Sequence, residues 1–192
     1  MIYQVWGVFI LSAFYGSYFA KMAVQKKKGI RTDQIGEGKT GFVKAIEVAM
    51  KIATYLVVAI ELVSLALGTT AFPGGIRLAG AIVASLGVAV FIAAAVTMRD
   101  SWRAGVSPTD ETALITTGIY RYSRNPAFLG FDMVYIGFVL MFFNGALLAA
   151  SAFAALMLHL QIVNGEEDFL ICTFGEEYLA YRKKVRRYIG RR

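Results

Sequence analysis

The sequence is poor in the residues that build disulfides and metal sites. Among its 192 residues there is one cysteine, Cys172, and one histidine, His159. A single cysteine excludes a disulfide within the chain, and neither residue stands in a spacing typical of metal ligands. We therefore predict no metal site. We interpret Cys172 as a small buried hydrophobic residue, because nothing beside it in the sequence would activate a thiol.

Charged residues are absent from three long stretches. Only 17% of the chain is charged, 57% is hydrophobic, and the mean hydropathy is +0.58. Met1 to Ala20, Leu78 to Met98 and Met133 to Gly165 contain no Asp, Glu, Lys or Arg. Uncharged stretches of this length are typical of membrane spans. The first lacks the basic start and the cleavage site of a signal peptide, so we expect it to be retained as a helix.

The hydrophobic pattern predicts an all-α integral membrane protein with five transmembrane helices. The last uncharged stretch has 33 residues and would be about 50 Å long as one helix, whereas the hydrocarbon core of a bilayer is about 30 Å thick. It must therefore turn back, and Asn144-Gly145 in its middle is a typical turn sequence. The spans are expected at about residues 3–23, 43–68, 77–98, 126–143 and 146–163, the last two forming a helical hairpin.

Lysine and arginine are distributed unevenly between the two sides of these spans. With five spans, 19 of the 20 Lys and Arg residues fall on one side, and only Arg77 falls on the other. The positive-inside rule then places the N-terminus outside and the C-terminus in the cytoplasm. In a prokaryote the membrane would be the cell inner membrane. We interpret the net charge of +7 as a topology signal, and predict no nucleic-acid partner.

The chain is predicted to form a single membrane domain, residues 1–192, in two parts. Residues 1–98 supply the three N-terminal spans, and residues 99–192 supply a polar loop, the hairpin and a tail. The tail from Glu166 onward predicts an amphipathic helix on the cytoplasmic membrane surface, separated from the fifth span by a break at Gly175. Its apolar stripe consists of Leu170, Phe174, Tyr178, Tyr181, Val185 and Tyr188.

Two polar clusters flank the predicted hairpin. One is the segment GIYRYSRNPAFLG, residues 118–130, and the other is the pair Glu166 and Glu167. Because the start of the fourth span and the end of the fifth are neighbours in a hairpin, we expect the clusters to meet. Pro126 suits a first helical turn, whose free N–H groups form an anion site. Together with Arg124, the acids and the tyrosines, this pocket suits a zwitterionic, ribose-bearing cation.

The two clusters resemble the C-terminal half of the isoprenylcysteine carboxyl methyltransferase and phospholipid methyltransferase superfamily. There, a Gly-x-Tyr…Arg-His/Asn-Pro-x-Tyr/Phe motif and a Glu-Glu…Phe-Gly-x-x-Tyr-x-x-Tyr motif surround S-adenosylmethionine. GIYRYSRNPAFLG and the later EEDFLICTFGEEYLAYRKKV are similar to these motifs, and DSWRAGV resembles the tryptophan-bearing segment after the third span. The resemblance covers roughly Trp102 to Tyr188.

The resemblance implies an S-adenosylmethionine-dependent methyltransferase whose lipophilic acceptor arrives sideways through the bilayer. The acceptor would be a prenylcysteine-like carboxylate, a phospholipid headgroup or another apolar thiol or amine. Asn125 stands where many members have histidine, and Ile162 where prenylcysteine-type members often have an arginine. Carried over position by position, the cofactor residues would be Tyr120, Arg124, Asn125, Pro126, Leu129, Gly130, Glu166 and Glu167.

Two further residues are candidates for chemistry. Methyl transfer from a sulfonium depends mainly on alignment and on exclusion of water, but an ammonium acceptor must first lose a proton. His159 lies seven residues before Glu166, on nearly the same helical face, and is a candidate base. Asp132, an acid near membrane depth, is a second candidate catalytic residue. A packed, structural role is the alternative for each, and for Glu61 we favour pairing with a polar group of another span.

Two other classes of protein stay open. A membrane reductase of the steroid-reductase type has similar Arg-His-Pro and Phe-Gly-x-x-Tyr elements but uses NADPH. A small transporter or structural membrane protein would use the polar clusters only to set its topology. The three classes differ in their ligand: S-adenosylmethionine, NADPH or no nucleotide-like ligand.

Overall fold

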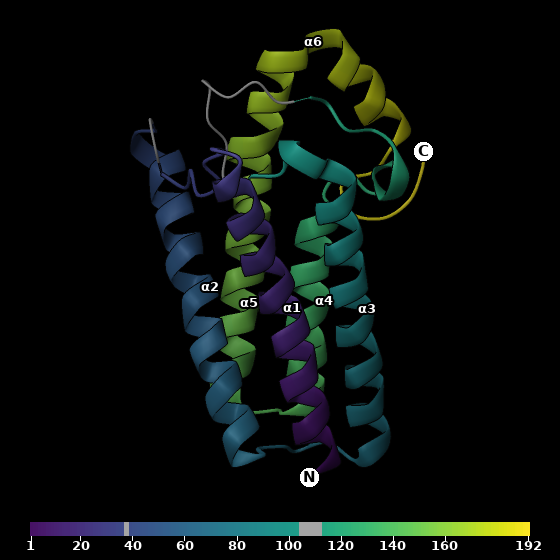
Figure 1. Cartoon of the computed structure of the whole chain (residues 1–192). Coiled ribbons are helices and arrows are strands. Elements are labelled where there is room, and N and C mark those ends of the chain that lie inside the picture. The colour runs from purple at the N-terminus through teal and green to yellow at the C-terminus, as the bar shows by residue number, and fades with distance from the viewer. Residues whose placement is uncertain (37–38, 104–112) are drawn as a thin grey trace.

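The computed structural model describes residues 1–36, 39–103 and 113–192, and within these ranges the chain is helical and has no strand. Figure 1 shows five helices side by side and a sixth that bends over one end of them. The predicted all-α class is therefore confirmed. The helices are α1 (Ile2–Lys27), α2 (Gly41–Leu67), α3 (Gly74–Met98), α4 (Pro126–Met141), α5 (Gly145–Gln161) and α6 (Glu167–Lys184).

Four stretches of helix are long and apolar enough to cross a membrane: α1, α2, Gly74–Ser101, which contains α3, and Gly145–Lys184, which contains α5. They support an integral membrane protein. Helix α4 is apolar but shorter, with 16 residues. Its length is about 24 Å at 1.5 Å per residue, so the count of five spans stays a prediction.

The turn between α4 and α5 forms at the predicted residues. Helix α5 begins at Gly145, and the side chain of Asn144 caps it by accepting a hydrogen bond from the Leu147 N–H at 2.9 Å. The Asn144 amide also donates to Ser64 Oγ at 2.7 Å and to Thr69 Oγ1 at 3.1 Å. One side chain therefore caps α5 and ties it to the end of α2.

Replacing Asn144 by alanine should lower the free energy of unfolding by about 2 kcal/mol. The loss combines a helix cap, worth about 1 kcal/mol, with the polar groups of Ser64 and Thr69 left without their donor. Thermal unfolding of the detergent-purified protein measures the change. Asn144→Asp keeps the cap oxygen but not the donor, so its stability should lie between those of the wild type and Asn144→Ala. Equal stability of all three proteins would contradict the role given to Asn144.

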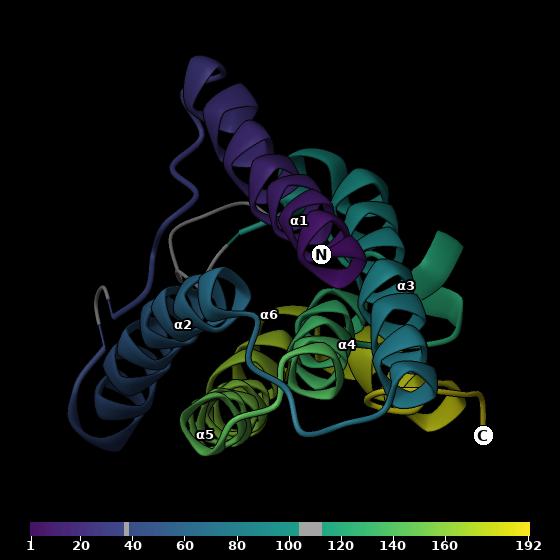
Figure 2. The ribbon, with the colours of Figure 1, turned by 90° about the horizontal axis from the view of Figure 1, so that it is seen from below.

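Helices α3 and α4 lie side by side (Figure 2). They approach at very short range, because glycines face each other across the contact. A Cβ atom added to Gly137 would lie 2.5 Å from the Ala84 Cβ and 2.5 Å from the Gly80 carbonyl oxygen. A Cβ on Gly130 would lie 2.9 Å from the Gly87 carbonyl oxygen. Small residues at such contacts let helix backbones approach closely in membranes. This crossing fixes the start of α4, and with it Arg124 and Asn125, against the end of α3.

One buried acid inside the bundle is paired with a tyrosine of another helix. Glu61 of α2 is fully buried, and the Tyr15 hydroxyl of α1 donates to its Oε2 at 3.1 Å. The predicted pairing of Glu61 with a polar group of another helix is confirmed.

The two ends of the bundle differ in charge. The N-terminus, the α2–α3 loop and the α4–α5 turn lie at one end (Figure 1). Among the described residues, Arg77 is the only lysine or arginine at that end, and it donates to the Met141 carbonyl at 2.9 Å. The other end carries the lysines and arginines of the connecting segments and the tail, and is called the basic end below.

The tail differs in detail from the predicted amphipathic helix. A π-helical turn, Ile162–Glu166, joins α5 to α6, and the break lies inside α6 at Gly175, where φ is 49°. The helix ends at Lys184. Tyr178, Tyr181 and Val185 of the apolar stripe are buried against Leu114 and other residues of the chain itself. Cys172 is exposed, so its predicted burial is wrong.

Candidate functional site

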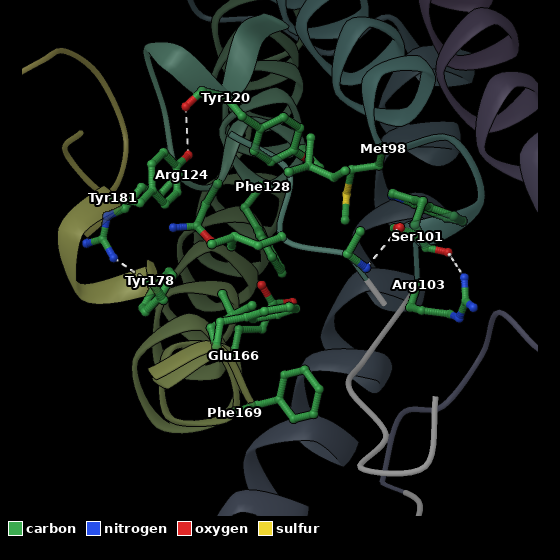
Figure 3. Close-up of a pocket in the computed structure, with 18 of the residues that line it drawn as sticks. Met98, Ser101, Arg103, Tyr120, Arg124, Phe128, Glu166, Phe169, Tyr178 and Tyr181 are labelled. Carbon is green, nitrogen blue, oxygen red and sulfur yellow. Dashed lines mark hydrogen bonds between the residues drawn. The ribbon is translucent and has the colours of Figure 1, made fainter. Parts of the chain in front are cut away.

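A pocket lies at the basic end, between the end of α3, the turn before α4, and α6 (Figure 3). The polar part of its lining includes Tyr120, Arg124, Asn125 and Glu166, together with Gln34, Ser101 and Arg103. The other part is apolar and aromatic: Met98, Trp102, Phe128, Phe169, Leu170 and Phe174. Four predicted cofactor residues thus lie around one space. The polar loop predicted between the third and fourth spans forms part of the wall, except that its residues 104–112 lie outside the described ranges.

Arg124 is the more buried of the two arginines that line this pocket, the other being Arg103, and it is only 8% exposed. Its Nη1 donates to the Tyr178 hydroxyl at 2.7 Å, and its Nη2 lies 3.0 Å from Glu167 Oε1. Its Nε is buried and has no hydrogen-bond partner among the described residues. A buried donor without a partner is costly, so this N–H is suited to an acceptor atom of a ligand.

Glu167 contacts Arg124 but is not among the residues that line the pocket. Arg187 donates to both of its oxygens, from Nε at 2.7 Å and from Nη2 at 3.1 Å. Burial alone would raise the pKa of the Glu167 carboxyl, but the Arg187 hydrogen bond and the charges of Arg124 and Arg187 outweigh it and hold the pKa below its usual value. Glu167 is therefore an ionised anchor for two arginines.

Glu166 is the acid that does line the pocket. It is half-buried, at the end of the π-helical turn. Burial raises the pKa of its carboxyl to about 7; Lys39 opposes the rise, and Glu47 and Glu167 add to it. The adjacent acids thus have opposite shifts because one is paired with arginines and the other is not.

The turn before α4 is held from two sides. The Tyr181 hydroxyl of α6 donates to the Tyr120 carbonyl oxygen at 2.6 Å. The Asn125 N–H donates to the Arg187 carbonyl oxygen at 3.2 Å, and the Asn125 side-chain amide donates to the same oxygen, also at 3.2 Å. These contacts fix the backbone from which the Arg124 side chain extends.

A model of the phospholipid methyltransferase family matches residues 63–177. This segment is more than half of the chain. It contains the first predicted motif, residues 118–130, and the second as far as residue 177, so that Tyr178 and Tyr181 lie just beyond it. The chain belongs to the phospholipid methyltransferase family.

Curated relatives of this phospholipid methyltransferase family member include three named protein-S-isoprenylcysteine O-methyltransferase. The Dictyostelium discoideum protein is 32% identical over 76 residues, 40% of this chain and 32% of its own length. The Saccharomyces cerevisiae protein is 36% identical over 72 residues, 38% of this chain and 30% of its own. The human protein is 34% identical over 77 residues, 40% of this chain and 27% of its own. The match thus spans about a third or less of these relatives.

The remaining predicted site residues of this family member lie outside the pocket lining. Pro126 is the first residue of α4, Leu129 follows within the first turn, and Gly130 faces Gly87 and Phe91 of α3. Nothing in these positions tests a role in cofactor binding. They place the three residues where they set the start of α4 and its contact with α3.

The two candidate catalytic residues also lie away from the pocket. His159 Nδ1 is 2.6 Å from the Tyr188 hydroxyl, and the two rings stack with centroids 6.0 Å apart. Asp132 is half-buried, and its Oδ1 has no hydrogen-bond partner within the described part of the chain. Neither residue is among those lining the pocket. Their catalytic roles stay predictions.

The structure adds pocket residues that the motifs did not assign. Trp102, 4% exposed, forms a wall, and Gln25 holds its carbonyl oxygen with a 2.9 Å hydrogen bond from α1. Phe128, Tyr178 and Tyr181 complete the aromatic side. Tyr178 and Tyr181 belong to the tail stripe, but spacing alone could not show that the Gly175 break turns this stripe onto the pocket.

Proposed function

We propose that the protein transfers a methyl group from S-adenosylmethionine to a lipophilic acceptor at the membrane face formed by its basic end. The observation that carries this proposal is the pocket itself. Most of the residues that line it belong to the segment that matches the family, and it brings Arg124, whose Nε–H has no partner among the described residues, and Glu166 beside an apolar wall that includes several aromatic rings.

The chemistry of the lining fits the parts of S-adenosylmethionine. Arg124 Nε–H would hold the carboxylate of the methionine moiety. The Glu166 carboxylate would accept hydrogen bonds from the ammonium or from the ribose hydroxyls. Trp102, Phe128 and Phe174 offer faces for the adenine ring. The cofactor, when bound, supplies an electrophilic methyl group on a sulfonium.

The protein's own residues would act by orientation and by exclusion of water. Tyr178 and Glu167 hold two of the three nitrogens of the Arg124 guanidinium, so that the third is fixed in direction. The apolar wall keeps water from an attacking nucleophile, which strengthens it. Alignment of this kind lowers a large part of the activation barrier in displacement reactions.

The acceptor is proposed only as a class. Relatives are named for isoprenylcysteine O-methylation, but this chain has a fully buried Ile162 where prenylcysteine-type members often have an arginine. An isoleucine cannot pair with a carboxylate. We therefore include a phospholipid headgroup and other apolar thiols or amines beside the prenylcysteine carboxylate. We further propose that the basic end is cytoplasmic and that the N-terminus lies outside, since basic residues concentrate on the cytoplasmic side of membrane proteins.

Calorimetric titration of the detergent-purified protein with S-adenosylhomocysteine and with NADPH tests this function. We expect the first to bind and the second not to bind. No binding of S-adenosylhomocysteine would overturn the proposal, and binding of NADPH would favour a reductase of the steroid-reductase type.

Glu166→Gln gives a test of the site with a pH dependence. Since the pKa of Glu166 is raised to about 7, its carboxylate is present above that pH and becomes protonated below it. Affinity for S-adenosylhomocysteine should therefore fall in the wild type as pH decreases from 8 to 6. The variant should bind about tenfold more weakly at pH 8 and lose this decline. The same pH dependence in both proteins would show that Glu166 does not contact the ligand.

A further inference from the structure

The last eight residues form a loop that returns to the bundle, named here the tail strap (residues 185–192). The chain leaves α6 at Val185, which is extended with φ −125° and ψ 135°. A backbone bridge between Val185 and Arg191 closes the loop, and Gly190 permits the return with φ 106°. Figure 1 shows this segment passing from the end of α6 back beside the start of α4.

The tail strap is hydrogen-bonded to the turn that carries Arg124. The Arg124 N–H donates to the Arg186 carbonyl oxygen at 3.1 Å, and the Gly190 N–H donates to the Tyr122 carbonyl oxygen at 2.7 Å. The Arg187 carbonyl oxygen accepts from the backbone and side chain of Asn125. The turn and the strap thus pair along their backbones, although more than 60 residues separate them.

Arg187 extends this contact to the pocket through Glu167. Its guanidinium donates to both Glu167 oxygens. One of these oxygens, Oε1, also lies 3.0 Å from Arg124 Nη2. Arg182 is a more distant neighbour, 3.8 Å from Oε2. Glu167 and Arg124 have only 5% and 4% of their side chains exposed, so their contact is largely withheld from water.

We propose that Arg187 is a positioning residue for Arg124 and that the tail strap completes the cofactor pocket. This inference rests on the proposed function, because its readout is binding of the cofactor product. Arg187 lies beyond the segment that matches the family and does not line the pocket. It acts through Glu167, whose two oxygens it holds in one plane.

The physical reason is the sharing of one buried carboxylate by two arginines. A bidentate guanidinium fixes the orientation of a carboxylate, which a single charge does not. With Arg187 removed, Glu167 would be free to rotate, and its main remaining partner would be Arg124. Arg124 would then be drawn toward Glu167, and its guanidinium would lose the position that it has beside the pocket.

The experiment compares S-adenosylhomocysteine affinity, by calorimetry on the full chain, among four variants and the wild type. Arg187→Ala should weaken binding roughly tenfold to a hundredfold, the range for losing hydrogen bonds to a charged group. Arg187→Lys keeps the charge without the paired geometry and should recover part of the loss. Gly190→Ala strains the return of the strap, leaves every charge in place, and should also weaken binding.

Arg186→Ala is the matched control, because it removes the same charge from the adjacent, exposed position. Its affinity should stay within about twofold of the wild type. Thermal unfolding without ligand accompanies each titration, so that a folded variant with weakened binding is told apart from an unfolded one.

Each outcome decides between the two proposals. No binding by the wild type would overturn the proposed function. Wild-type binding that Arg187→Ala leaves unchanged would overturn the positioning role alone. Equal losses of affinity in Arg187→Ala and Arg186→Ala would also overturn the positioning role, since a general charge effect would then suffice. The same holds if Arg187→Lys binds S-adenosylhomocysteine no more tightly than Arg187→Ala. If Arg187→Ala does not fold, the test uses Arg187→Lys and Gly190→Ala. Unchanged affinity in both variants would then overturn the positioning role.

Discussion

Arg124→Ala is expected to weaken binding of S-adenosylhomocysteine by a hundredfold or more. Two losses combine. The pocket loses its buried guanidinium and an N–H that has no partner among the described residues, and buried Glu167 loses one of its two close partners. Each charge-assisted hydrogen bond contributes about 1.5 to 3 kcal/mol, and 1.4 kcal/mol is about tenfold in affinity. Calorimetry on the folded variant measures the change.

Arg121 provides the control for this prediction. It lies three residues earlier in the same turn and is exposed. Arg121→Ala removes the same charge from the membrane face and should leave the affinity unchanged, as expected of a residue that only contacts lipid headgroups. A loss as large as that of Arg124→Ala would show that surface charge, and not the buried guanidinium, governs binding.

Gly137→Ala is expected to have the largest effect on stability. The added Cβ would lie within 2.6 Å of the Ala84 Cβ and N and of the Gly80 carbonyl oxygen. Two of these atoms are backbone, so the helices themselves must separate. Overpacking of this kind costs about 1 to 3 kcal/mol, and more where the contact cannot relax. Thermal or denaturant unfolding in detergent should show the loss, accompanied by weaker cofactor binding, because α4 carries the pocket.

The matched control is Gly16→Ala in α1. No atom lies within 4 Å of the Cβ that it would add. Since alanine favours helix over glycine by about 1 kcal/mol, this variant should be as stable as the wild type or slightly more stable. Equal destabilisation by both substitutions would contradict the role of the α3–α4 crossing, because the loss would then not depend on a close contact, and helix propensity predicts the opposite sign.

The sequence was sufficient to predict those features that depend on local pattern. The Asn144-Gly145 turn followed from the length of an uncharged stretch, and the structure forms it with Asn144 as the cap. The hairpin then predicted that the Arg124 turn and the Glu166–Glu167 pair would meet, and Arg124 does contact Glu167. Local hydropathy and chain reversal are enough for both inferences.

Features that depend on the path of the tail could not be predicted. The apolar stripe suggested a helix as far as Tyr188, but the helix ends at Lys184 and the chain returns to the turn before α4. No sequence motif marks Arg187, which the structure pairs with Glu167. The roles of Glu166 and Glu167 were likewise inseparable in sequence, because only the tail determines which of the two faces the arginines.

Helical spacing also gave too little information about His159. Seven residues place it on nearly the same face as Glu166, but the π-helical turn Ile162–Glu166 alters the angular relation between them. His159 contacts Tyr188 of the tail strap and is not among the residues that line the pocket.

Transfer of an isotopically labelled methyl group tests the central claim most directly. The protein would be reconstituted in vesicles with labelled S-adenosylmethionine and offered phospholipid, a prenylcysteine compound and an apolar thiol or amine in turn. The account predicts that label enters the organic-extractable product of at least one acceptor with the wild type, and that Arg124→Ala abolishes this transfer while Arg121→Ala does not. Label that stays entirely in water with every acceptor, although the wild type binds the cofactor, would contradict it.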